Sequence, residues 1–166
     1  MVLDLQGVFA GEQQSLPFSF SLDMSGFDRG GIHPFPEAIE ICGRVENQAG
    51  VVELRAQANA VYCSPCDRCQ RDVKRPMAIP MQHVLVTSLN QEDNDELILV
   101  EDMRLDVSEL AESDIILALP SKFLCKESCR GLCPQCGKDL NDGDCGCDTR
   151  QTDPRLESLR QLLESE

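Results

Sequence analysis

Cysteine thiols are the side chains whose type and spacing could do chemistry in this chain of 166 residues. The chain contains 10 cysteines, and eight of them lie in compact groups. These eight candidate metal ligands are Cys66, Cys69, Cys125, Cys129, Cys133, Cys136, Cys145 and Cys147. A cysteine pair separated by two residues can direct both sulfurs at one ion, and structural zinc sites combine two such pairs. The sequence therefore predicts one or two zinc ions per chain.

The ligands can be divided between ions in more than one way. Cys133 and Cys136 precede Gly137, and a glycine there permits a tight turn whose amides point at sulfur. Cys145 and Cys147 could complete that four-sulfur site. The other four thiols of the group could form a second site. An alternative, in which the first Cys-x-x-Cys pair shares an ion with the second, stays open.

Two other uses of these thiols fit the sequence less well. The N-terminus has no basic start followed by an apolar stretch, so we expect a cytoplasmic protein whose reducing surroundings disfavour disulfides. Cys133 and Cys136 have the spacing of a thioredoxin-type redox pair, but such a pair normally opens a helix without other thiols around it. Cys42 and Cys63 have no obvious partners and are expected to be small buried side chains, although Cys63 could compete as a ligand.

Charge and composition argue against several classes of function. The chain has 15 Lys and Arg against 29 Asp and Glu. This net charge of −14 disfavours unaided binding of a phosphate backbone and favours a basic protein partner. Aromatic residues make up 4%, too few for a platform that stacks nucleic-acid bases. No apolar run approaches the ~18 residues that span a membrane.

Basic residues nevertheless gather around the thiols. Eight of the 15 bases lie near the two cysteine-rich segments. Six of them are candidate RNA contacts: Arg68, Arg71, Lys74, Arg75, Lys126 and Arg130. They could also offset the net charge of about −2 that a zinc ion with four thiolates carries. The sequence leaves both interpretations open.

Alternating apolar and polar residues predict an α+β fold built on a mainly antiparallel sheet. We expect strands over residues 16–22, 38–45, 51–61 and 76–86, a turn at 47–50 and a loop at 28–36. These elements and a helix near 107–118 would form a β-rich domain over residues 1–120. A cysteine-rich zinc module over 121–150 and a C-terminal helix over 151–166 would follow it.

Both predicted helices carry N-terminal signals. Asp106 and Glu109 have the spacing of a capping box, and the helix should stop near Pro120. Asp153 followed by Pro154 would begin the C-terminal helix. The stretch from 92 to 114 holds ten acids against one base, so it predicts either a solvated surface or a docking surface for a basic protein.

Signatures of catalysis are scarce in the sequence. The two histidines, His33 and His83, lie in no obvious constellation, and there is no glycine-rich phosphate loop or nucleophile elbow. The carboxylates are spread through solvated stretches rather than paired for acid–base work. We therefore expect no catalytic residues and no small-molecule substrate.

A longer motif links the thiols. Cys66-Asp-Arg-Cys69 is followed, after the acidic stretch, by Cys129-Arg-Gly-Leu-Cys133-Pro-Gln-Cys136-Gly137-Lys-Asp-Leu-Asn141. This order resembles the YceD family, the large ribosomal RNA subunit accumulation proteins of bacteria and plastids. The resemblance spans roughly residues 37–163. This chain carries Gln70 where members of that family often have leucine.

The resemblance implies a role in the accumulation or processing of large-subunit ribosomal RNA. It also implies a link to a small basic protein of the large subunit, or to precursor ribosomal RNA. It establishes no catalytic residues, so we expect a non-enzymatic ribosome-assembly factor. Two enzymatic alternatives stay open: a thiol redox protein that uses Cys133 and Cys136, and an rRNA-processing nuclease with unrecognised carboxylates.

Overall fold

A computed structural model describes residues 1–88 and 97–147 of the chain. It divides the chain into a sheet unit, Met1–Ser64 with Asp72–Phe123, and a cysteine unit, Pro65–Arg71 with Leu124–Glu166. The loop that carries the first Cys-x-x-Cys pair thus groups with the C-terminal cysteines, whereas the sequence analysis placed it within residues 1–120. The helix predicted over 151–166 and the acids at 92–96 lie outside the described residues.

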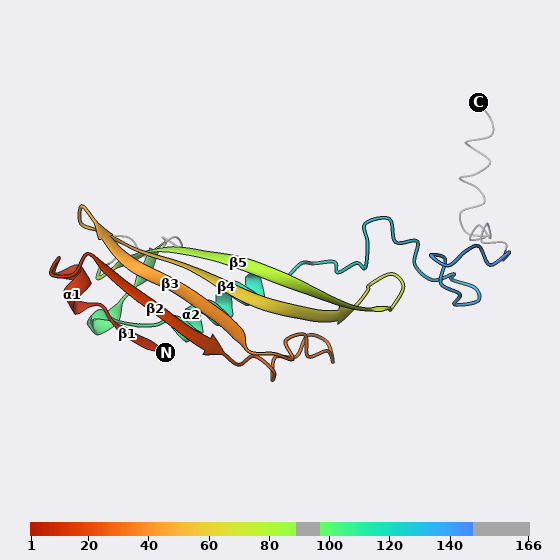
Figure 1. Ribbon diagram of the computed structural model, residues 1–166, viewed down its shortest axis with the longest axis horizontal. Helices are drawn as coiled ribbons and strands as arrows, with labels where there is room; N and C mark the ends of the chain where they lie inside the picture. The colour runs from red at the N-terminus through yellow and green to blue at the C-terminus, as the bar shows by residue number, and fades with distance from the viewer. Residues whose placement is uncertain (89–96, 148–166) are drawn as a thin grey trace, which may run out of the picture. The chain divides into compact units, whose positions relative to one another are not determined.

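The sheet unit is built on a five-stranded sheet in the order β2-β3-β4-β5-β6 (Figure 1). The elements are β1 (Val2–Asp4), α1 (Gln6–Phe9), β2 (Ser15–Leu22), β3 (Ile39–Gln48), β4 (Val51–Pro65), β5 (Asp72–Val86), β6 (Leu97–Leu99), η1 (Glu101–Met103), β7 (Arg104–Asp106) and α2 (Val107–Leu117). β2, β3 and β4 pair antiparallel, β6 pairs parallel with β5, and β1 pairs with β7 in a separate ribbon. The predicted α+β fold with a mainly antiparallel sheet is confirmed.

The β3–β4 hairpin forms because apolar residues alternate along both strands. The buried residues of β3 are Ile39, Ile41 and Val45. The turn at Ala49 and Gly50 has φ angles of 53° and 89°, the mirror-image turn that matches the twist of the flanking strands. Cys42 directly follows the buried Ile41 and is exposed. The expectation that Cys42 is buried is therefore wrong, because the period of two places it on the outer face.

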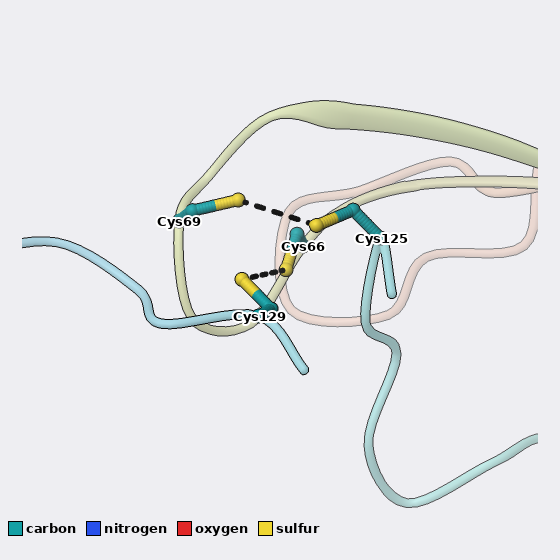
Figure 2. A group of neighbouring side chains, drawn as sticks. All are labelled: Cys66, Cys69, Cys125 and Cys129. Carbon is teal, nitrogen blue, oxygen red and sulfur yellow. Dashed lines mark hydrogen bonds between the residues drawn. The ribbon is translucent and has the colours of Figure 1, made fainter. Parts of the chain in front are cut away.

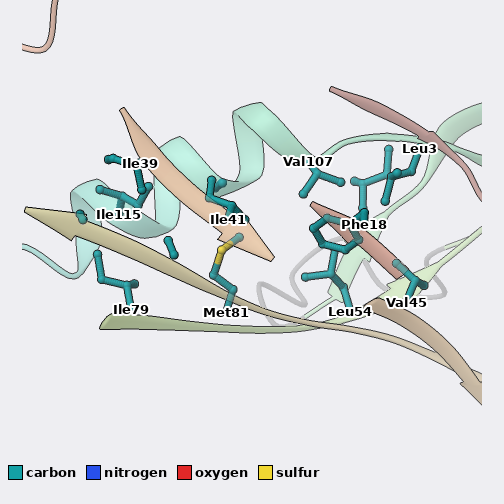
Figure 3. Packing of buried hydrophobic residues seen from close by; sticks show 14 of the residues in the cluster. Leu3, Phe18, Ile39, Ile41, Val45, Leu54, Ile79, Met81, Val107 and Ile115 are labelled. Carbon is teal, nitrogen blue, oxygen red and sulfur yellow. The ribbon is translucent and has the colours of Figure 1, made fainter. Parts of the chain in front are cut away.

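Helix α2 packs on the sheet through one face, and Figure 3 shows Val107 and Ile115 among the sheet residues. Val107, Ala111 and Ile115 recur every four residues and are each 0% exposed. The carboxylate of Asp106 accepts a hydrogen bond from the N–H of Ser108 at 2.9 Å, so the predicted N-terminal cap is present. No described helix is long and apolar enough to cross a membrane.

A small aromatic cluster holds one end of the sheet unit together. The ring of Tyr62 meets Phe35 and Phe123 edge-on, at centroid distances of 5.7 and 4.8 Å. The Tyr62 hydroxyl accepts a hydrogen bond from Arg29 at 2.8 Å, and the same guanidinium donates to the carbonyl of Pro120 at 2.8 Å. These contacts fix the chain that leads from α2 towards Cys125.

The close approach of β3 and β4 at Gly43 provides a test of this packing. A Cβ at Gly43 would lie 2.4 Å from the Cβ of Ala56 and 2.5 Å from the carbonyl oxygen of Arg55, so backbone would have to move. We expect Gly43→Ala to lower the free energy of unfolding by about 1–3 kcal/mol, measured by urea denaturation. Gly26→Ala is the control, because a Cβ there would contact nothing within 4 Å. Equal effects of the two substitutions would contradict the packing.

Candidate metal centres

Four thiols of the cysteine unit converge to form the first candidate centre, site 1 (Figure 2). Its members are Cys66, Cys69, Cys125 and Cys129, whose sulfurs all lie within 4.8 Å of one another. The Sγ–Sγ distances are 3.8 Å for Cys66 and Cys129 and 3.6 Å for Cys69 and Cys125. Sulfurs bound to one tetrahedral zinc are about 3.8 Å apart, so the spacing fits that ion. Cys66, Cys69 and Cys129 are at most 4% exposed, so water is largely excluded.

The remaining four ligand candidates form the second centre, site 2. They are Cys133, Cys136, Cys145 and Cys147, and their sulfurs also lie within 4.8 Å of one another. Cys133 is 2% exposed, whereas Cys136 is an exposed residue. The structure thus groups the thiols by the first of the two divisions considered from sequence, and Cys42 and Cys63 belong to neither cluster. Site 2 differs from site 1 in being local in sequence and open to solvent.

A backbone loop positions the first pair of ligands. The N–H of Cys66 donates to the carbonyl of Arg71 at 2.8 Å, and the N–H of Gln70 donates to the carbonyl of Cys66 at 2.9 Å. The chain turns at Gln70 with a φ of 60°. This left-handed conformation costs a residue other than glycine about 1–2 kcal/mol. The loop that presents Cys69 therefore contains a strained residue.

The Cys133 loop repeats this geometry. The N–H of Cys133 donates to the carbonyl of Lys138 at 2.8 Å, and the N–H of Gly137 donates to the carbonyl of Cys133 at 2.9 Å. Gly137 has a φ of 73° and so occupies the position that Gln70 occupies in the first loop. The two Cys-x-x-Cys pairs lie in turns of the same type, but only the second turn has a glycine at the position with positive φ.

Each centre contains at least one thiol whose surroundings favour the thiolate. Burial opposes ionisation of Cys66, but N–H groups of its own loop and of Cys125 outweigh it and lower the pKa of the thiol to about 6. The N–H groups of Cys136 and Gln135 lower the pKa of Cys133 to about 6. Thiolates are the form that binds metal, so the surroundings of these two residues suit a role as metal ligands.

The pKa values of other thiols in the two centres shift in the opposite direction. Hydrogen bonding to Cys136 and Cys145 raises the pKa of Cys147 to about 12. The N–H of Arg71 favours the thiolate of Cys69, but burial and the adjacent thiols outweigh it and raise its pKa to about 12. Clustered thiols therefore retain protons until a cation displaces them. Both clusters have the donor atoms, spacing and charge that could hold a metal ion.

The bases of the cysteine unit proposed as RNA contacts are engaged by the protein itself. Arg71 forms ion pairs with Asp139, at 2.7 Å, and with Asp142. Arg130 pairs with Asp144 at 2.6 Å. Arg68 donates to the carbonyl of Cys129 at 2.8 Å. These guanidinium groups brace the loops around the thiols.

The candidate RNA contacts of the sheet unit are also engaged. Lys74 forms an ion pair with Glu37 at 2.7 Å. The guanidinium of Arg75 stacks on the ring of Phe123 at 5.1 Å from its centroid. The sixth candidate, Lys126, belongs to the cysteine unit and is exposed.

Two polar residues to which the sequence analysis gave no role support site 1. The side-chain amide of Asn141 lies 3.4 Å from the sulfur of Cys129, and its hydrogen bond lowers the pKa of that thiol. Asp139 is the residue that accepts hydrogen bonds from Asn141. The sequence signal was present as an Asp-x-Asn directly after a Cys-Gly-Lys turn, where short polar side chains can reach nearby backbone and sulfur.

The fold and the two clusters define an α+β protein with two four-cysteine clusters that could each hold a metal ion. The family model described as Large ribosomal RNA subunit accumulation protein YceD matches residues 54–163, and the chain belongs to this family. Family membership associates the chain with the accumulation of large-subunit ribosomal RNA. No solved structure matches the chain.

Two relatives show how widely the sequence pattern extends. Uncharacterized protein YlbN of Bacillus subtilis is 26% identical over 133 residues, which cover 77% of this chain and 76% of the relative. Uncharacterized protein Rv2926c of Mycobacterium tuberculosis is 26% identical over 151 residues, which cover 89% of this chain and 70% of the relative.

The shared turn predicts opposite effects at its two equivalent positions. Gly137→Ala should destabilise the metal-bound cysteine unit by about 1–2 kcal/mol, because alanine is strained at positive φ. Gln70→Gly should stabilise the metal-bound unit by up to about 1 kcal/mol, because it relieves the strain at φ 60°. Chelator competition, which measures the midpoint of metal release for each variant, checks both. Effects of the same sign would contradict the equivalence of the two turns.

Proposed function

We propose that the protein supports the accumulation of large-subunit ribosomal RNA without catalysing a reaction, by binding a basic protein of the large ribosomal subunit. Membership of the YceD family supports a role in the accumulation of this RNA. The net charge of −14 supports a partner that is basic. An acidic protein attracts a basic one at long range and shields it from unwanted contacts with RNA.

We also propose that the two centres each hold a zinc ion with a structural role. Four thiolates leave no open coordination position, so zinc bound there would supply structure rather than a reactive water. The need for it is visible in the burial pattern. In the described part of the cysteine unit, the only buried side chains are Cys66, Cys69, Cys129 and Cys133. Binding one such ion contributes on the order of 10 kcal/mol to folding.

The distribution of charge is the observation that carries the choice of a protein partner over RNA. The described residues of the cysteine unit contain five bases and five acids. Eight thiolates with two divalent ions would add about −4, since each tetrathiolate zinc carries about −2. The ion pairs of Arg71 and Arg130 neutralise two of the bases locally. Such a surface repels a phosphate backbone, so the cysteine unit is unsuited to binding RNA on its own.

The sheet unit offers an acidic face that suits a basic partner. A groove of about 360 Å³ runs between β6, β7 and α2, and its apolar wall includes Ile98, Leu99 and Leu110. The acids Glu101, Asp106 and Glu109 and one base, Arg104, also line it, and we take the exposed Glu101 and Glu109 as its rim. We call this groove and its rim the acidic face. A basic amphipathic segment could bury apolar side chains against the leucines while its Lys and Arg residues pair with the glutamates.

Metal removal provides the first test. Protein prepared without chelator should contain two zinc ions per chain by elemental analysis. Removal of zinc should abolish amide protection in residues 124–147 and leave it intact in β3 and β4, because the apolar core of the described residues lies in the sheet unit. Cys66→Ser should lose one ion, whereas the control Cys42→Ser, at an exposed cysteine outside both clusters, should keep two. Protected amides in a metal-free cysteine unit would refute the structural role.

Charge reversal provides the second test. Glu101→Lys with Glu109→Lys should weaken binding to basic large-subunit proteins by about tenfold or more at low salt, since rim charges govern steering and register. The control is Glu12→Lys with Glu40→Lys, which changes the net charge equally at exposed acids elsewhere in the sheet unit. Isothermal titration at two salt concentrations measures the difference. If both pairs weaken binding equally, net charge and not the acidic face is responsible.

A thiol redox function is the second candidate, because Cys133 has a pKa of about 6 and Cys136 is exposed. Alkylation of the isolated protein by iodoacetamide distinguishes the two functions. Thiolates bound to zinc should react slowly until a chelator is added, whereas a redox pair should react at once and cycle with glutathione. No observation in the described residues favours the nuclease alternative.

A further inference from the structure

Asn141 orients a ligand of site 1 without being a ligand itself. Its Nδ2 donates to the sulfur of Cys129 at 3.4 Å, and its Oδ1 accepts a hydrogen bond from the N–H of Arg130 at 3.0 Å. Asp139 Oδ1 accepts from the N–H and from the Nδ2 of Asn141, at 2.8 and 2.7 Å. The amide is therefore held at both ends, and the sulfur it contacts is held with it.

Asp139 reaches the other half of site 1 as well. Its Oδ2 forms an ion pair with Arg71 at 2.7 Å, and the Asp139 side chain is only 15% exposed. The carbonyl of Arg71 is the group that accepts the N–H of Cys66. Arg71 also pairs with Asp142. The segment 139–142 thus braces the loops on both sides of site 1, and we call it the brace.

The brace is at the same time a part of site 2. It lies in the connection between Cys136 and Cys145, the inner ligands of the two cysteine pairs of that site. A β-bridge joins Leu132 to Asp139, and the N–H of Leu140 donates to the carbonyl of Gly131 at 2.9 Å. An ion at site 2 fixes both ends of this connection and so lowers the entropy that the brace must lose to reach site 1.

We propose that the two centres are thermodynamically coupled, with a divalent ion at site 2 raising the affinity of site 1 through the brace and Asn141. The inference rests on the proposal that both clusters bind metal. Site 1 is buried but has ligands from distant segments, whereas site 2 is exposed and local, so site 2 can form first and organise the other. Coupling between two sites typically changes affinity 5–150-fold, and linkage makes the factor equal in both directions.

The test is a Co²⁺ titration of the full chain under reducing conditions, followed by the thiolate-to-cobalt absorption. Cys136→Ser with Cys145→Ser removes site 2, and we expect the dissociation constant of Co²⁺ at site 1 to rise about tenfold or more. Cys66→Ser with Cys125→Ser removes site 1 and should weaken site 2 by the same factor. An unchanged dissociation constant at the remaining site in both variants would overturn the coupling.

Asn141→Ala tests the route and keeps all eight thiols. It should weaken Co²⁺ binding at site 1 and reduce the further effect of removing site 2, so that the double-mutant cycle is not additive. The control is Asn59→Ala, an exposed amide of β4 that accepts a hydrogen bond from Gln57. Additive effects of the two changes would overturn the role of Asn141. A chain that binds no Co²⁺ would refute the metal centres themselves, whereas independent binding at both would refute only the coupling.

Discussion

In the described part of the cysteine unit, two clusters of four thiols stand where a folded domain usually has an apolar core. Its described part has no cluster of buried aliphatic side chains, and Leu132 is 38% exposed. The sheet unit is the opposite case, because its core is a continuous cluster of aliphatic and aromatic residues between the sheet and α2. The sheet unit is therefore stabilised by hydrophobic burial, whereas the proposed zinc ions would stabilise the cysteine unit through bonds to sulfur. A chelator would act on the second kind of stability and not on the first.

The candidate ligands could be named from the sequence because the geometry of Cys-x-x-Cys is local, but the sequence left their division into two clusters between two alternatives. Cys66 and Cys129 are 63 residues apart, and only the fold brings their sulfurs to 3.8 Å. Gly137 indicated a left-handed turn in the sequence, because glycine adopts positive φ readily. Gln70 gave no such indication, because its positive φ is imposed by the loop. The brace was missed for the same reason. The sequence does not reveal the role of Asp139 and Asn141, because only the fold brings them to their partners, Arg71 and Cys129.

The strands likewise differ in how far the local sequence predicts them and how far they depend on distant partners. Alternation located β3 and β4 because each buries one face, and it also explains why Cys42 is exposed. β5 begins at Asp72, before the predicted start at 76, because pairing with a neighbouring strand continues through polar residues. The ribbon of β1 and β7 was missed altogether. Its strands have three residues each and form only because distant partners such as Leu3 and Leu105 meet in register.

Charge alone would not make a selective assembly factor. The described part of the sheet unit contains fifteen acids and seven bases, so it attracts any basic protein, and attraction of this kind raises association rates more than it distinguishes partners. Discrimination requires contacts that only one partner can make. The apolar wall of the acidic face supplies such contacts, because Leu99 is 41% exposed beside Glu101 and a partner must present a matching apolar side chain to cover it. The leucines, more than the glutamates, would then determine which basic protein is held.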